Sequence, residues 1–384
     1  MKNIYIGIVL VLSLIVVKGC VTPFEPEEIK AIDNMIVIEG NILQNDITRV
    51  MISRSLALNA ENVIDYVSKA IVWVENQNGV KYMGYETKQG KVIEYQINTI
   101  GINPSLQYKL CVNIGSKRYE SDLIPILEAP PIDSIGYNVD TVKNSVTFYV
   151  NTHDQTNKTK YYKWSFTEDW EFKSQYMSYV RYDRETNKVL DIDLADNRYY
   201  CWGKGVSSSI LIATTSNLSQ DNVYQKSLVS MGSSDLRVNF LYSMELTQMA
   251  ITRDAYIYWE NIRKNSDDIG GIFAPQPSEI GGNIRCITKP AERVLGYISA
   301  SKVTKKRIFA NASDIKVYKD PKYCDPVIVN AQNPIPLHEL WDTGYDIAYY
   351  SEMDNESLWA AKKCVDCRLL GSKVKPWFWP NDHK

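Results

Sequence analysis

Histidine is scarce in this sequence, and the short motifs of the common enzyme classes are missing. The three histidines, His153, His338 and His383, stand apart from one another among loop-type residues. No HExxH, no GxSxG and no phosphate-binding glycine loop occurs, which argues against zinc proteases, serine hydrolases and nucleotide-binding enzymes. The sequence therefore predicts no metal centre, no cofactor and no enzyme activity, although a triad assembled from distant segments would leave no such motif.

An excess of basic residues is also absent. Lysine and arginine number 43 against 45 aspartates and glutamates, so nucleic acid is not an expected partner. The hydrophobic content of 45% is enough for globular cores, and 26 tyrosines with 9 tryptophans favour strands. The 384 residues therefore predict a β-rich protein of two or three domains.

Long apolar runs are missing beyond the start of the chain. Lys2 precedes an apolar run at residues 4–17, and the small Gly19 comes directly before Cys20. The run is short for a membrane span, and this order is typical of a lipoprotein signal peptide. We predict that residues 1–19 are removed and that Cys20 carries the lipid. The alternative is an uncleaved anchor helix with an incidental cysteine.

The acidic, proline-punctuated residues 20–32 predict a tether that does not fold by itself. The β-rich body begins after it, at residue 33. Asn78-Gly79 lies between two β-type runs and predicts a tight hairpin, and further strands are expected at residues 108–114 and 118–123. Regularly spaced strands predict an N-terminal antiparallel β-sandwich, Ig-like or transthyretin-like, over residues 33–126.

A proline-rich link at residues 127–133 leads to a larger β-rich domain, residues 134–384. Alternating side chains predict strands at residues 146–150, 160–166 and 236–246. Thr252 can cap one main helix near residues 252–265. Glycines and prolines make residues 269–284 an irregular loop, either structural or binding, and the tail at residues 324–379 is expected to be loops held by disulfides.

Six cysteines follow Cys20, and an exported protein favours disulfides. Cys111 lies in an apolar strand and is interpreted as a buried thiol. The disulfide candidates are Cys201, Cys286, Cys324, Cys364 and Cys367. This is an odd number, so at least one of them is free or pairs with Cys111. Cys364 and Cys367 are also spaced like a redox pair or half of a zinc site, but we favour structural disulfides.

Two groups of residues are candidates for function. Glu168, Asp169 and Glu171 flank Trp170, as carboxylates flank a stacking ring in carbohydrate-active enzymes, but we favour an aromatic strand end with solvated carboxylates. The aromatic residues most suited to a binding surface are Trp170, Phe273, Trp377 and Trp379. Most aromatic residues are expected to pack in the cores, and the proline-flanked C-terminal segment is the best exception.

Motifs along nearly the whole chain resemble those of the DUF4249 lipoproteins of Bacteroidetes. The matching segments are Cys20 with its acidic sequel, residues 35–40, 161–164, 201–202, 273–278, 282–284, 294–297, 306–309 and 364–368, and the final tryptophans. The resemblance implies an outer-membrane lipoprotein commonly encoded beside TonB-dependent receptors, with no established activity. It brings no catalytic residues.

The resemblance also suggests how the surface is processed. Glu25, Glu27 and Glu28 resemble the signal that sends Bacteroidetes lipoproteins to the outer face of the membrane. Ser134 and Thr141 stand in short motifs that resemble O-glycosylation sites of that group. Both motifs are expected near the exposed link between the domains.

We therefore expect a lipid-anchored protein on the cell exterior that assists a TonB-dependent transporter without catalysis, in nutrient capture or complex assembly. Its ligand would be a small molecule, a glycan or a peptide. The alternatives are a surface hydrolase of glycans or peptides that uses the carboxylates near Trp170, and an adhesin or structural surface subunit.

Overall fold

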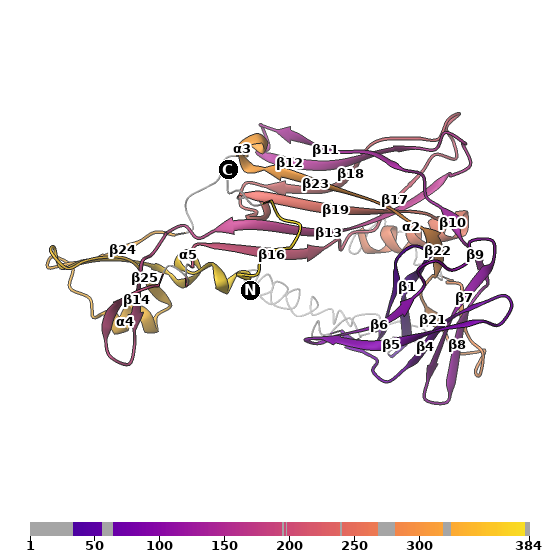
Figure 1. The fold of residues 1–384 in the computed structure, drawn as a ribbon, viewed down its shortest axis with the longest axis horizontal. Helices are drawn as coiled ribbons and strands as arrows, with labels where there is room; N and C mark the ends of the chain where they lie inside the picture. Colours follow the sequence, from indigo (N-terminus) through magenta and orange to yellow (C-terminus); the bar gives the residue numbers. More distant parts are fainter. Residues whose placement is uncertain are drawn as a thin grey trace, which may run out of the picture.

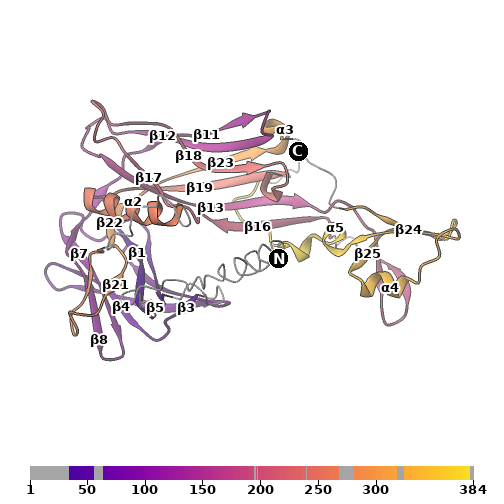
Figure 2. The same cartoon turned by 180° about the vertical axis from the view of Figure 1, so that it is seen from behind.

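The computed structural model describes residues 34–55, 64–193, 196, 198–238, 240–267, 281–317 and 324–380. These residues are mainly β, so the predicted fold class is confirmed. An N-terminal domain and a small distal lobe lie at opposite ends of the long axis, and a central sandwich of two sheets connects them (Figure 1). Figure 2 shows the same arrangement from behind.

The N-terminal domain is one curled sheet that closes over its own core. Its first strands are β1 (Ile36–Leu43), β2 (Ile47–Arg54), β3 (Asp65–Tyr66), β4 (Ile71–Asn76), β5 (Lys81–Gln89), β6 (Val92–Asn98), β7 (Gln107–Ile114), β8 (Lys117–Ser121), β9 (Ile124–Pro125) and β10 (Leu127–Glu128). Ile38 and Ile52 from β1 and β2 share a core with Val74 and Leu110 from β4 and β7. The two halves of the sheet therefore face each other as a sandwich.

The predicted hairpin joins β4 and β5. Trp73 pairs with Met83 and Glu75 with Lys81 in antiparallel register. Gly79 has a φ of 83°, which a residue without a side chain adopts at no steric cost. The local sequence therefore predicted this turn correctly.

One segment of the chain returns to the N-terminal sheet, which differs from the sequence-based division at residue 134. Strands β20 (Ile284–Cys286), β21 (Val294–Leu295) and β22 (Ser299–Lys302) pair with β8 and β1. The pairing with β1 is parallel, which requires a long crossover, and the central sandwich supplies it. A Cβ at Gly296 would lie 2.1 Å from the Ile38 carbonyl oxygen, so glycine permits this close approach.

The central sandwich packs a three-stranded sheet against a five-stranded one. The first sheet has the order β11 (Ile132–Asp140), β12 (Ser145–His153) and β18 (Asn222–Gly232). The second has the order β16 (Tyr200–Val206), β13 (Tyr161–Lys173), β19 (Leu241–Ala250) and β23 (Thr304–Asn311), with β17 (Leu211–Thr214) also on β13. Phe148, Trp164 and Tyr242 are buried between the two sheets.

The strand predicted at residues 236–246 begins later than expected. Leu236–Val238 form the 3-10 turn η2, and β19 runs from Leu241 to Ala250. The Asp235 carboxylate accepts hydrogen bonds from the Arg237 backbone N–H and from its guanidinium, which stabilises the turn. Side-chain hydrogen bonding to the local backbone therefore overrides the alternating pattern here.

The predicted helix is α2 (Arg253–Asp267), and Thr252 caps it. The Ala255 backbone N–H donates to Thr252 Oγ1 at 3.2 Å. The helix contacts β13 and β17, and Trp259 lies over the Lys163 amine at 3.5 Å. Helix α3 (Ala312–Ile315) is a single turn after β23. Among the described residues, no helix is both long and apolar enough to cross a membrane.

The tail is held by disulfides, as predicted, but it forms a folded lobe and not loops. It contains β24 (Val327–Val329), α4 (Leu337–Asp342), β25 (Tyr345–Ser351), β26 (Glu356–Ala361), α5 (Lys362–Val365) and η3 (Cys367–Leu369). The hairpin of β14 (Val180–Asp183) and β15 (Lys188–Asp191) packs against it, and Tyr182 shares a core with Trp359 and Ile347. A distant hairpin completes the core, which the sequence of the tail does not reveal.

The two disulfides are Cys201–Cys367 and Cys324–Cys364. Cys364 and Cys367 therefore bond to different partners and do not form a redox pair with each other. Cys111 is a buried free thiol, as predicted, but Cys286 is free as well, so its place among the disulfide candidates was wrong. Cys286 belongs to the core of the N-terminal domain, away from the tail cysteines.

Cys111 and Cys286 cannot pair with each other because strand β8 lies between them. Cys111 is opposite Glu120 and Cys286 is opposite Tyr119, and these neighbours on β8 point to opposite faces of the sheet. Burial also raises the pKa of the Cys111 thiol to about 12. Both thiols are therefore expected to be unreactive in the folded protein.

We predict that native lipidated protein shows no thiol that reacts with Ellman's reagent and that denatured, unreduced protein shows two. Burial hides Cys111 and Cys286 until the chain unfolds. The Cys286→Ala variant should show one thiol after denaturation. Fewer than two thiols in the denatured wild type would contradict the assignment.

Candidate functional site

The three carboxylates near Trp170 lie on two different faces of β13. Because side chains alternate along a strand, Glu168 points into the central sandwich, while Asp169 and Glu171 point away from it. Glu168 is therefore separated from Asp169 and Glu171, and it does not face either of them across a shared cleft. Strand periodicity alone contains this information.

Glu168 belongs to a buried polar network at one end of the sandwich core. Both of its carboxylate oxygens accept from Arg237 Nη1 at 3.0 Å, and the Tyr242 hydroxyl donates to Oε2 at 2.8 Å. Arg237 also pairs with Asp235. Burial and the Glu168 carboxylate raise the pKa of Tyr242, which keeps its hydroxyl protonated. These contacts join β13 to β19 and to the η2 turn, so their role is structural.

Asp169 lies on the outer face of the five-stranded sheet, where one arginine interacts with two acidic groups. Arg307 Nη2 donates to Glu245 at 2.9 Å, and Nη1 lies 3.8 Å from Asp169. Burial raises the pKa of Asp169, with Arg307 opposing the shift. Within the described part of the chain, no group of three or more histidines, cysteines or carboxylates is arranged to hold a metal ion.

Trp170 is part of the core edge and is half-buried. Its indole lies over Gly203, where a Cβ would come within 2.2 Å of the ring. It packs beside the Cys201–Cys367 disulfide and Phe172. The cross-strand glycine creates space for the Trp170 ring against the sheet, so the ring has a structural role.

The C-terminal aromatic segment, residues 376–380, divides into a docked part and a free part. Trp379 is buried, and its indole N–H donates to Glu171 Oε2 at 3.0 Å. Phe378 stacks on the Arg307 guanidinium at 3.7 Å. Trp377 is 94% exposed and contacts the Phe378 ring edge-to-face. Trp379 is therefore structural, and Trp377 is exposed to solvent.

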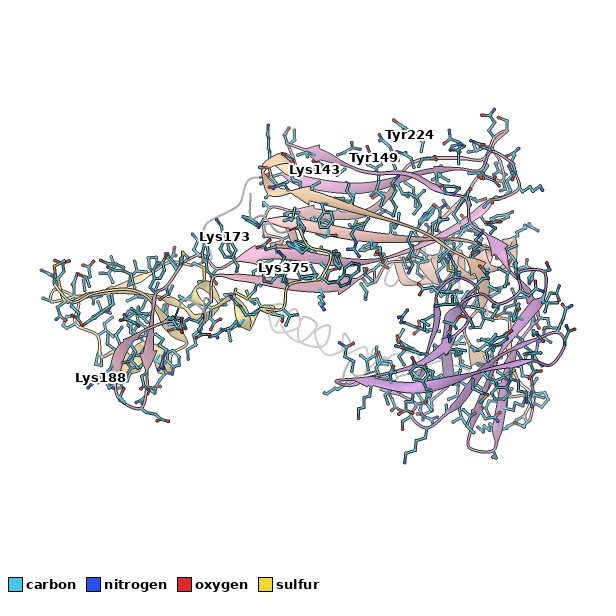
Figure 3. All side chains as sticks on the ribbon, in the orientation of Figure 1. Lys143, Tyr149, Lys173, Lys188, Tyr224 and Lys375 are labelled. Atoms are coloured by element: carbon cyan, nitrogen blue, oxygen red, sulfur yellow. A yellow bond between two sulfur atoms is a disulfide. The ribbon has the colours of Figure 1, made fainter. Side chains whose placement is uncertain are left out.

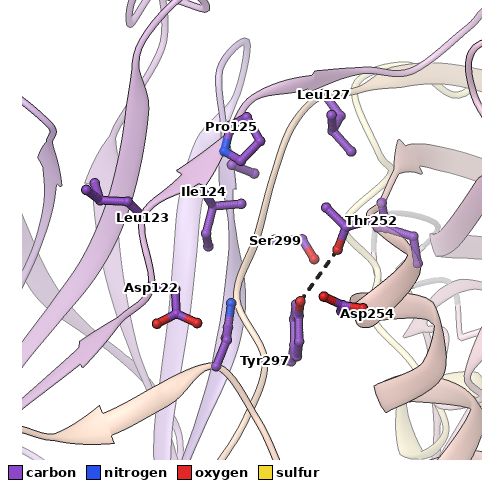
Figure 4. Close-up of a pocket in the computed structure, with 12 residues that line it drawn as sticks. Asp122, Leu123, Ile124, Pro125, Leu127, Thr252, Asp254, Tyr297 and Ser299 are labelled. Atoms are coloured by element: carbon purple, nitrogen blue, oxygen red, sulfur yellow. Dashed lines mark hydrogen bonds between the residues drawn. The ribbon is translucent and has the colours of Figure 1, made fainter.

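Three hollows that share lining residues follow the junction between the N-terminal domain and the central sandwich. The largest has a volume of about 870 Å³ and is bordered by the proline-rich link. It shares Leu127 and Ile251 with a smaller hollow, drawn in Figure 4, where Thr252 Oγ1 lies 3.5 Å from the Tyr297 hydroxyl. The sequence did not indicate this interdomain crevice, because its walls come from segments far apart in the chain.

A hydrogen-bonded pair of a histidine and an aspartate lines the largest hollow. His153 Nδ1 lies 2.7 Å from Asp133 Oδ2, and this hydrogen bond raises the pKa of His153. Nearby, the Asp154 carboxylate accepts from the backbone N–H groups of Thr156 and Thr159. Asp154 therefore organises the loop that forms the wall.

The proposed glycosylation residues have different environments. Thr141 is exposed in the turn between β11 and β12, at the far end of β11 from the link. Ser134 is half-buried on β11, and its hydroxyl accepts from Asn151 Nδ2 at 2.9 Å. Cys20, Glu25, Glu27, Glu28 and Phe273 lie outside the described residues.

We predict that Glu168→Gln lowers the free energy of unfolding by about 3 kcal/mol, because it leaves Arg237 with one buried partner fewer. Asp169→Asn, the neighbouring control, should change it by less than about 1 kcal/mol, since this carboxylate gains little from its distant arginine. Urea unfolding followed by tryptophan fluorescence measures both. Equal effects of the two substitutions would contradict a structural role specific to Glu168.

The chain matches no curated protein. One solved structure that it resembles is described as "Complete structure of manganese lipoxygenase of Gaeumannomyces graminis and partial structure of zonadhesin of Komagataella pastoris". The match covers 57% of this chain and 89% of the other at 12% identity, with a TM-score of 0.18, and carries no argument about fold or function. The family described as "Domain of unknown function (DUF4249)" matches residues 21–307, and the chain belongs to this family.

Proposed function

We propose that this protein is a lipid-anchored lipoprotein on the outer face of the outer membrane and a non-catalytic partner of a TonB-dependent transporter. The lipoprotein-type segment that ends at Cys20 supports the anchor. Membership of the DUF4249 family supports the setting, through the resemblance to the Bacteroidetes lipoproteins. Nutrient capture or assembly of the transporter complex is the biological role.

The observation that carries the docking role is the exposure of Trp377. Its 94% exposure leaves a large apolar side chain in water, although the chain on both sides of it is held firmly. The Cys201–Cys367 disulfide and two hydrogen bonds of 2.8 Å between Trp202 and Ser372 fix the preceding residues. On the other side of Trp377, the hydrogen bond of Trp379 to Glu171 fixes the chain. A rigidly presented tryptophan is typical of an interface anchor.

The chain that leads to Trp377 also has exposed apolar side chains. Leu369, Leu370 and Val374 are 59%, 45% and 69% exposed. Residues 367–380 contain one arginine and two lysines and no acidic residue. Lys375, labelled in Figure 3, belongs to this stretch. Exposed apolar side chains close in sequence to these lysines fit an acidic surface loop on the partner.

The carboxylates support binding in preference to hydrolysis. Glu168 neutralises Arg237 in the core, and Glu171 accepts from Trp379 on the opposite face of the same strand. Glycosidase carboxylates need to face a common substrate cleft. Glu168 therefore faces away from Asp169 and Glu171, and on the outer face Arg307 interacts with Asp169 while Trp379 donates to Glu171.

We predict that Trp377→Ala lowers the amount of transporter recovered with the protein by at least about tenfold, because loss of a central tryptophan removes a typical hot spot. The full chain is purified from detergent-solubilised native outer membranes, and mass spectrometry identifies and quantifies a TonB-dependent receptor.

Met353→Ala is the matched control, because Met353 is 95% exposed but lies in the distal lobe. It should leave recovery unchanged. Wild-type protein that recovers no TonB-dependent receptor would refute the proposed partner. Equal recovery with both variants would refute the role of Trp377.

The anchor and its direction can be tested on intact cells. We predict that Cys20→Ala abolishes lipidation and membrane retention, because the thiol that carries the lipid is lost. Replacement of Glu25, Glu27 and Glu28 by alanine should leave lipidation intact but protect the protein from added protease. Unchanged surface digestion of the triple variant would contradict the export signal.

A further inference from the structure

The outer face of the β11–β12–β18 sheet consists of small polar, amide and tyrosine side chains. Its residues are Ser134, Gly136 and Asn138 on β11, Thr147, Tyr149 and Asn151 on β12, and Tyr224, Gln225, Ser227 and Ser230 on β18. We propose that this face binds a neutral glycan. The inference deepens the proposed role in nutrient capture, on which it rests, by naming the class of ligand.

None of the residues named for this face has a charged side chain. Charged groups occur at its ends, where Asp133 pairs with His153 and where Asp140 precedes the turn to β12. Nucleic acids and acidic polymers require cations, which this face does not offer. Protein interfaces favour a large apolar centre, which is also missing from this face. Hydroxyl-rich neutral sugars match the amides and tyrosines.

The amide groups are arranged in advance by hydrogen bonds among themselves. The Gln225 backbone N–H donates to Asn151 Oδ1 at 2.7 Å, and Asn151 Nδ2 donates to the Ser134 hydroxyl at 2.9 Å. Asn138 Nδ2 donates to Gln225 Oε1 at 3.3 Å. An amide has two donor hydrogens and two acceptor lone pairs, so each retains capacity for a ligand hydroxyl. Preorganisation lowers the entropic cost of binding.

Two tyrosines on neighbouring strands supply ring surface beside these amides. Tyr224 is 75% exposed, and its hydroxyl accepts from Gln225 Nε2 at 3.2 Å. The Tyr149 ring lies over Gly136, where a Cβ would come 2.5 Å from the Tyr149 hydroxyl oxygen. Figure 3 shows both tyrosines at the same border of the sandwich. Rings held in this way can cover the C–H face of a sugar and bond its hydroxyls.

The backbone of β18 is distorted at this place. The register with β12 shifts between Val150 and Thr152, and Gln225 has a φ of 46°. This bulge leaves both Tyr224 and Gln225 exposed, although strict alternation would turn one of them inward. A strained non-glycine conformation that presents two ligand-type side chains is typical of a functional site.

Native affinity electrophoresis of the full-length lipidated protein in detergent tests the inference. The gels contain barley β-glucan, starch or galactomannan as neutral probes, or polygalacturonate as an acidic one. We expect retardation in at least one neutral gel. Tyr224→Ala and Tyr149→Ala should each weaken the apparent affinity about tenfold, because each removes one ring surface.

Tyr349→Ala is the matched control, because Tyr349 is 55% exposed on the distal lobe. It should be retarded like the wild type. Gln225→Gly should bind more weakly, since it removes the amide. The proposal would be overturned if no neutral gel retarded the wild type, or if polygalacturonate alone did so. It would also be overturned if the tyrosine variants were retarded as strongly as the wild type. No transporter takes part, so this result is independent of the Trp377 experiment.

Discussion

Strand β13 is the structural element on which the central part of the molecule depends. It pairs with β19 along most of its length and with β16 and β17 on the other side. Its inward side chains, including Trp164 and Phe166, form the core of the sandwich. Its outward side chains contact helix α2 through Lys163 and the C-terminal segment through Glu171. One strand therefore joins the core to two distant segments, because alternate residues point to opposite faces.

This division of faces also determines what the surface offers for function. The outer face of the five-stranded sheet is partly covered by Phe378 and Trp379, and Trp377 is presented beyond it. The three-stranded sheet remains open on its outer side and has an uncharged face of amides and tyrosines. The two proposed binding surfaces therefore belong to different sheets, so a transporter and a glycan could occupy them separately.

Local patterns were sufficient for a large part of the fold. The Asn78-Gly79 turn, the Thr252 cap and the strands around Val146 and Tyr108 follow from interactions between residues close in sequence. Alternation failed at Leu236–Val238, where the Asp235 side chain stabilises a turn. The return of residues 284–302 to β1 could not be predicted, because a parallel pairing leaves no local signal.

The sequence by itself determined the mainly β class, the scarcity of catalytic motifs, the lipoprotein-type start and the family resemblance. These properties depend on composition and on residues that are neighbours in the chain. Only the tertiary structure decided the disulfide partners, the opposite faces occupied by Glu168 and Glu171, and the exposure of Trp377 beside the buried Trp379. Each of these depends on which distant segments meet, and the free energy of packing the whole chain selects those contacts.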